Sequence, residues 1–140
     1  MLPKNMSKNL PAVVDTNLII RFLTQDNVGQ YKQCRQLLEN SKFKSLEIPD
    51  LVIAEIIYVL TKVYQQPKNL VISQINSLIS LDQIKTNCFI IKTALDLFQK
   101  HNISFPDAYL SALVVTGQNC LVYTFDKQLL KINHSKAKSP

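Results

Sequence analysis

Four carboxylates in this chain stand beside or inside apolar segments, where a soluble domain rarely places charge: they belong to Asp15, Glu55, Asp107 and Asp126. Moving a lone carboxylate out of water costs much more free energy than one core contact returns, so such groups need a neutralising partner. No lysine or arginine lies within three positions of Asp15 or Glu55. A bound divalent cation is therefore the leading candidate for that partner.

Carboxylate oxygens are the ligands that hard cations prefer, and Mg²⁺ keeps several waters, so four acids could serve one or two ions. Without a cation, two carboxylates ~5 Å apart at an effective dielectric constant of ~20 repel each other by roughly 3 kcal/mol. A zinc site is not expected, because neither His101 nor His134 stands at metal-ligand spacing from a cysteine or from the other histidine.

Three of the four acids also have a structural explanation. Asp15 follows an apolar strand-like run and precedes a helix, so it could be a helix N-cap or a ligand at the carboxyl edge of a parallel sheet. Asp107 follows Pro106 in a first helical turn, where the helix dipole favours a carboxylate. Asp126 follows another apolar run; the hydroxyl of Thr124 could orient it, although a simple turn explains both residues.

Glu55 has the weakest structural explanation, since every residue three or four positions away on its predicted helix is apolar or aromatic. Asp96 is the contrasting case. It has Lys92 and Lys100 four positions away on either side, which predicts an ordinary solvated ion pair.

Short β-rich runs alternate with longer helical ones, a pattern that predicts βαβ units, a parallel sheet and an α/β fold. Asp50 is expected to cap one of the helices, and Pro67 to stand in the first turn of the next. The expected strands are Ala12–Asp15, Leu46–Ile48, Ile84–Lys85 and Leu121–Thr124, and the expected helices are Gln30–Asn40, Leu51–Gln65, Pro67–Leu81, Asn87–His101 and Pro106–Val115.

The chain has 140 residues, 46% of them hydrophobic, and a net charge of +6, which predicts one compact domain with a basic exterior. A basic surface around an acidic pocket suits a polyanionic substrate, although lysines also serve solubility alone. No apolar run is long enough for a membrane span, and a cytoplasmic location is expected. The segment Leu51–Leu60 is apolar nearly all round, which predicts either a subunit or partner interface or central burial.

Four ordered segments together resemble the PIN-domain nucleases, and most closely the VapC-type toxins of bacterial toxin–antitoxin pairs. They are Val14-Asp15-Thr16-Asn17-Leu18-Ile19-Ile20-Arg21, Ile48-Pro49-Asp50-Leu51-Val52-Ile53-Ala54-Glu55, Ser104-Phe105-Pro106-Asp107-Ala108 and Thr124-Phe125-Asp126. The resemblance implies one PIN-like domain over residues 1–132, with a short central parallel β-sheet flanked by about seven helices. A basic, flexible tail over residues 133–140 is expected to follow.

The resemblance also implies a Mg²⁺- or Mn²⁺-dependent endoribonuclease that forms a homodimer and is inhibited by a small antitoxin protein. Asp15, Glu55, Asp107 and Asp126 would be both the catalytic and the metal-binding residues. Their polar support would come from Asn17 and Thr124, with Arg21 and Lys127 as candidates for RNA contact.

Two other functions are weighed against this one. A PIN-fold scaffold that binds RNA or a protein partner without turnover would have the same sequence pattern. A phosphoryl-accepting α/β domain fits poorly, because Asp15-Thr16-Asn17 lacks the second acid of the Asp-x-Asp phosphatase pattern.

Overall fold

The computed structural model describes residues 10–140. Its contacts divide the chain into two compact units, an N-terminal unit that ends at Thr86 and a C-terminal unit that covers Asn87–Pro140.

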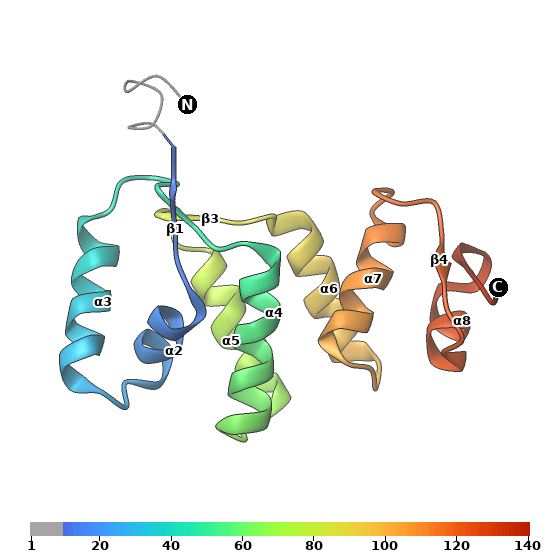
Figure 1. The fold of residues 1–140 in the computed structure, drawn as a ribbon, viewed down its shortest axis with the longest axis horizontal. Helices are drawn as coiled ribbons and strands as arrows, with labels where there is room; N and C mark the ends of the chain where they lie inside the picture. Colours follow the sequence, from blue (N-terminus) through green and yellow to red (C-terminus); the bar gives the residue numbers. More distant parts are fainter. Residues whose placement is uncertain (1–9) are drawn as a thin grey trace. The chain divides into compact units, whose positions relative to one another are not determined.

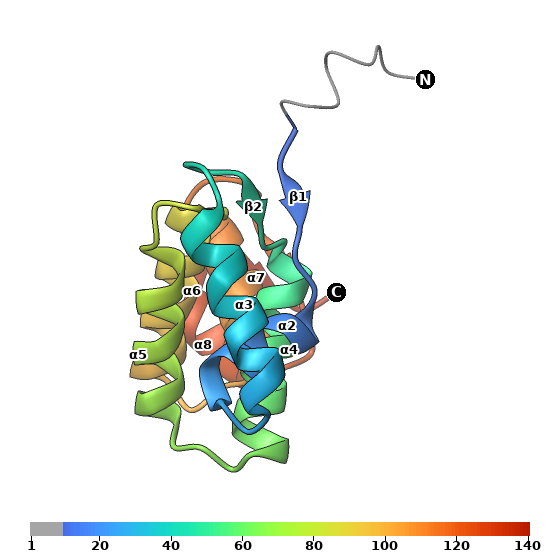
Figure 2. The same ribbon diagram turned by 90° about the vertical axis from the view of Figure 1, so that its left-hand side faces the viewer.

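A three-stranded parallel sheet forms one side of the N-terminal unit. The strands β1 (Ala12–Val13), β2 (Leu46–Glu47) and β3 (Ile84–Lys85) lie in that order, so β2 is the central strand. The first residues of the three strands are in register across the sheet, and Figure 2 shows β1 and β2 side by side. The predicted strands are confirmed, although each is only two residues long.

Four α-helices and one π-helix accompany this sheet: α2 (Thr16–Thr24), α3 (Val28–Asn40), α4 (Asp50–Tyr58), η1 (Val59–Val63) and α5 (Lys68–Ile79). The expectation that Asp50 caps α4 is wrong, because Pro49 holds the N-cap position and Asp50 is the first helical residue. Pro67 likewise stands at the N-cap of α5 rather than in its first turn. Proline suits both positions, since its fixed φ leads into a helix and it has no N–H to leave unpaired.

The helix α4 is buried on one face only, so its all-round apolar sequence does not mean all-round burial. Ile53, Ile56 and Ile57 are buried in the core, whereas Leu51 and Tyr58 are 81% and 61% exposed. The exposed residues share a face with Glu55, because positions 51, 55 and 58 lie one above another on a helix.

Two packed helices form the centre of the C-terminal unit, α6 (Cys88–Lys100) and α7 (Phe105–Val115) (Figure 1). The rings of Phe98 and Phe105 meet edge to face between them, with centroids 5.9 Å apart. A two-stranded parallel sheet of β4 (Val122–Tyr123) and β5 (Ala137–Lys138) completes the unit with α8 (Lys127–Asn133) and a short 3₁₀ helix, η2 (His134–Lys136).

The end of the chain differs from the flexible tail that was expected over residues 133–140. β5 pairs with β4 in register, and Ala137 is buried. The pairing connects segments fifteen positions apart, so local composition, which is basic and polar, gave no sign of it.

Residues 10–140 contain seven α-helices and only parallel strand pairs. The predicted α/β fold with a short parallel sheet and about seven helices is therefore confirmed. No helix among these residues is long and apolar enough to cross a membrane.

Candidate functional site

Asp15 lies between β1 and α2 and caps the helix. Its Oδ1 accepts a hydrogen bond from the backbone N–H of Leu18 at 3.0 Å, which satisfies one of the unpaired donors of the first turn. The side chain is exposed to solvent. The N-cap interpretation of Asp15 is thus confirmed, and its second carboxylate oxygen remains available to another ligand.

Glu55 is held by a residue from another helix. The hydroxyl of Thr16, the first residue of α2, donates to Glu55 Oε2 at 2.7 Å. Thr16 is only 7% exposed, whereas Glu55 itself is exposed. A buried donor of this kind fixes the rotamer of Glu55 while the carboxylate faces water. Because Thr16 follows Asp15 directly in the sequence, its hydrogen bond links Glu55 to the residue next to Asp15.

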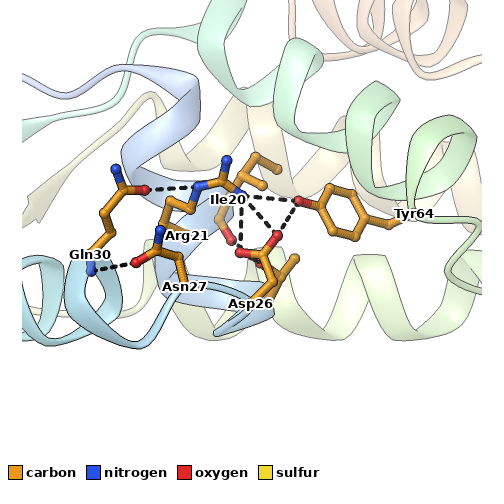
Figure 3. A network of polar contacts seen from close by, with 7 residues as sticks. Ile20, Arg21, Asp26, Asn27, Gln30 and Tyr64 are labelled. Carbon is orange, nitrogen blue, oxygen red and sulfur yellow. Dashed lines mark hydrogen bonds and ion pairs between the residues drawn. The ribbon is translucent and has the colours of Figure 1, made fainter.

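The guanidinium of Arg21 belongs to a polar network around Asp26 (Figure 3). Arg21 Nη1 donates to both carboxylate oxygens of Asp26 at 2.9 and 2.8 Å, and the Tyr64 hydroxyl donates to Asp26 Oδ2 at 2.7 Å. Arg21 Nε donates to Gln30 Oε1 at 2.9 Å. The network joins α2, the start of α3 and the residue after η1. These contacts account for the position of the Arg21 guanidinium without any contact to RNA.

The contacts of this network shift the pKa values of Asp26 and Arg21. The hydrogen bond from the Tyr64 hydroxyl lowers the pKa of Asp26 below its usual range. Burial, the next largest effect, opposes this shift, and the hydrogen bonds from Thr24 and Arg21 and the Arg21 charge add to it. The Asp26 carboxylate, with its hydrogen bond and its charge, raises the pKa of Arg21 in turn. Both groups are therefore held in their charged forms.

A hollow of about 340 Å³ lies between α2 and α3. Burial raises the pKa of the Cys34 thiol, with a smaller contribution from the negative charge of Asp15. The thiol sits against the Leu18 carbonyl at 3.4 Å. The hollow is lined by Asn17, Leu18, Arg21, Gln30, Gln33, Cys34 and Leu37.

In the C-terminal unit, Asp107 is the third residue of α7, behind Ser104 at the N-cap and Pro106 in the first turn. The Asp107 backbone N–H donates to Ser104 Oγ at 3.3 Å. The expected helix-dipole position is confirmed, and the Asp107 side chain is half-buried.

Asp126 caps α8, and Thr124 supports the same turn. Asp126 Oδ1 accepts from the backbone N–H groups of Gln128 and Leu129 at 2.8 and 3.0 Å. The Asp126 N–H donates to Thr124 Oγ1 at 2.9 Å. The predicted Thr124 contact therefore exists, but it orients the backbone of Asp126 rather than its carboxylate.

Residues 12–134 match the PIN domain family. The match covers most of the chain. The chain belongs to the PIN domain family. PIN domains are typically metal-dependent nucleases that act on RNA or DNA, generally with divalent metal ions. No curated protein matches the chain.

The donor set of this PIN domain suits a hard divalent ion. Asp15 and Glu55 each use one carboxylate oxygen in a protein hydrogen bond and expose the side chain to solvent. Such oxygens match the preference of Mg²⁺ and Mn²⁺. Neither unit by itself, over residues 10–140, gathers three His, Cys, Asp or Glu side chains into a metal-binding group.

The assumption that the four acids are buried is wrong. Asp15, Glu55 and Asp126 are exposed, and Asp107 is half-buried. Glu55 lies on the exposed face of α4, and Asp15 and Asp126 stand in the exposed connections between a strand and the helix that each of them caps. The separate prediction of a solvated Asp96 is confirmed by its exposed 2.9 Å ion pair with Lys100.

Sequence reasoning missed Thr16 and Tyr64. Thr16 stood in the quoted PIN-like segment directly after Asp15, so a polar first helical residue was the available signal. Tyr64 carried no signal, since its partner Asp26 lies 38 positions away.

Proposed function

We propose that this PIN domain is a Mg²⁺- or Mn²⁺-dependent endoribonuclease, and that it is the toxin of a toxin–antitoxin pair. The observation that carries the proposal is the Thr16–Glu55 hydrogen bond of 2.7 Å, which orients an exposed carboxylate from the residue next to Asp15. The Glu55 carboxylate is exposed to solvent, yet the buried Thr16 hydroxyl donates to it. Its fixed rotamer suits a ligand that must hold a defined position.

Asp15, Glu55 and Asp107 would hold the principal ion, and Asp126 a second ion or the attacking water. Asn17 and Thr124 would supply polar support. Divalent ions held there would activate a water, align the scissile phosphate and stabilise the leaving oxygen.

The described contacts support separate roles for the two oxygens of each capping acid. Asp15 and Asp126 each place one oxygen on helix N–H groups, which keeps the carboxylate in one orientation. The other oxygen of each carboxylate accepts no hydrogen bond from a described residue. Glu55 is oriented by the Thr16 hydroxyl instead, since it lies within α4 and has no helix end to cap.

Lys127 is exposed at the start of α8 and is the better placed of the two proposed RNA contacts. Arg21 could contribute only around its network with Asp26, Tyr64 and Gln30. The further expectations from the VapC-like resemblance are a homodimer, a small antitoxin as inhibitor and action in the cytoplasm.

The decisive test is cleavage of structured RNA by the purified chain with Mn²⁺, with EDTA, and with an Asp15→Asn variant. Asparagine is as good an N-cap as aspartate, so this variant keeps α2 while it removes the charge. Asp96→Asn, which alters an exposed acid on α6, is the matched control. We expect cleavage only by wild type and Asp96→Asn in Mn²⁺. Unchanged cleavage in EDTA and by Asp15→Asn would refute the nuclease proposal, and RNA retention without cleavage at any metal concentration would establish the scaffold instead.

The toxin role has its own test. Expression of the wild-type chain in a bacterium should arrest growth, Asp15→Asn should not, and a small protein encoded beside the gene should relieve the arrest. Growth arrest by Asp15→Asn, or nuclease activity without any arrest, would contradict the toxin role.

A further inference from the structure

The last part of the C-terminal unit is strongly basic. Residues 127–138 contain four lysines and no acidic residue. Lys127 and Lys131 are exposed one turn apart on α8, and Lys138 is exposed on β5. Lys136 is exposed as well, and its Nζ donates to the Val114 carbonyl at 3.3 Å. None of the four forms an ion pair with a carboxylate of the described residues.

Two exposed aromatic side chains lie beside these lysines. Tyr123 is 68% exposed and Phe125 is 80% exposed, whereas Thr124 between them is half-buried. Tyr123 ends β4, and Phe125 stands at a bend between β4 and α8, two residues further along the chain. Tyr123 is in register with Lys138 of the neighbouring strand, and the Thr124 N–H donates to the Lys138 carbonyl at 3.0 Å. The aromatic pair and the basic cluster are thus parts of one surface.

From this surface we infer a binding site for single-stranded RNA, in which Tyr123 and Phe125 stack on bases and Lys127, Lys131 and Lys138 bind phosphates. Exposed rings beside cations are the arrangement that holds unpaired nucleotides, because every base has a face to stack and every linkage has a charge to neutralise. An apolar protein partner is a poorer match for four uncompensated lysines. The inference deepens the proposed function and rests on it only for the choice of RNA as substrate.

The surface formed by these aromatic and basic residues includes Asp126, one of the proposed site acids. Asp126 lies between Phe125, which would stack, and Lys127, which would bind phosphate. Its carboxylate faces the first turn of α8, where it caps the helix. An RNA strand bound by Phe125 and Lys127 would therefore place its phosphate backbone next to Asp126, one of the proposed site acids.

The sequence contains no tryptophan, so one introduced at position 125 would be the only such fluorophore in the full chain. In EDTA, where cleavage is blocked, we expect single-stranded oligouridine to quench Phe125→Trp and a duplex of the same length to do so much less. Phe89→Trp is the control, because Phe89 is 69% exposed on α6 of the same unit. Absence of quenching at position 125, or equal quenching at both positions, would overturn the inference.

Affinity supplies the second measurement. We expect Phe125→Ala and Tyr123→Ala each to weaken oligouridine binding by about 5- to 150-fold, the usual effect of losing one stacked base. The double variant Lys127→Gln with Lys131→Gln should reduce the slope of log affinity against log salt by about 1.4, or about 0.7 per lost phosphate contact. Lys32→Gln with Lys42→Gln, two exposed lysines of the N-terminal unit, should leave the slope unchanged. An equal change in both double variants would mean diffuse attraction and would overturn the site.

These results separate the inference from the proposed function. Quenching and specific affinity loss without any cleavage in Mn²⁺ would support the RNA surface and refute the nuclease. Cleavage that requires Asp15, with no quenching at position 125, would support the nuclease and refute the surface.

Discussion

The hydroxyl of Thr16 donates a 2.7 Å hydrogen bond to Glu55 Oε2 across 39 positions of sequence. A second contact joins the same parts of the N-terminal unit, since Arg21 on α2 and Tyr64 after η1 meet at 3.3 Å. α2 is therefore connected near both its ends to the segment that carries Glu55. The first connection orients a carboxylate proposed to be functional, and the second connects the far ends of the two segments.

Replacement of Thr16 by valine should show how much RNA cleavage depends on the orientation of the Glu55 carboxylate, because the charge of Glu55 stays in place. Valine keeps the shape of the buried side chain but removes the donor, so we expect a loss of about 1 kcal/mol in the free energy of unfolding and a clear fall in RNA cleavage. Glu55→Gln keeps an acceptor for Thr16, so it should unfold like wild type yet fail to cleave. Thr93→Val, which removes only a bond to the Phe89 carbonyl within α6, is the control. Full activity of Thr16→Val would contradict the orienting role.

The capping role of Asp126 is measurable apart from its proposed metal role. Asp126→Ala removes the acceptor of two backbone N–H groups and should cost about 1 kcal/mol of stability in urea unfolding. Asp126→Asn keeps the cap, so its stability should stay within a few tenths of a kcal/mol of wild type while cleavage falls. Equal destabilisation by both variants would show that charge, rather than capping, stabilises the start of α8.

Bound metal should stabilise the fold by mass action. At a Mn²⁺ concentration one hundred times the Kd, the gain should be about 2.7 kcal/mol, visible as a higher Tm. Asp15→Asn should lose most of this shift, whereas Asp96→Asn should keep it. A Tm that does not respond to Mn²⁺ or Mg²⁺ in the wild-type chain would contradict the metal site.

The network around Asp26 predicts a pH dependence. Because the folded-state pKa of Asp26 is lowered, chiefly by the Tyr64 hydroxyl, its stabilisation is fully present above the unfolded pKa of about 4. It is lost progressively as the pH falls below that value and through the folded pKa. Urea unfolding should therefore show wild type more stable than Asp26→Asn at pH 7, with the difference shrinking as the pH falls below about 4. Tyr64→Phe should move the loss to higher pH; a difference independent of pH would refute this account.

Interactions over a few residues could be derived from the sequence by itself. The strand end followed by Asp15 predicted a helix start there, and Asp15 caps that helix through an N–H group three positions away. The ion pair of Asp96 with Lys100 is equally local. Such contacts need only helical spacing, which the residue order specifies, and the ordered motifs were enough to indicate the family.

Tertiary structure alone decided which acids are exposed and which distant residues meet. Apolar neighbours suggested buried carboxylates, but Glu55 lies on the exposed face of α4, and Asp15 and Asp126 stand in exposed connections. The sequence does not reveal which face of a helix meets the core. The contacts of Glu55 with Thr16 and of Tyr64 with Asp26 span 39 and 38 positions. The pairing of β5 with β4 turned a polar tail into a strand. Each of these contacts depends on how distant segments pack against one another. A local sequence pattern cannot specify it, because many residues of similar chemistry along the chain could serve as the partner.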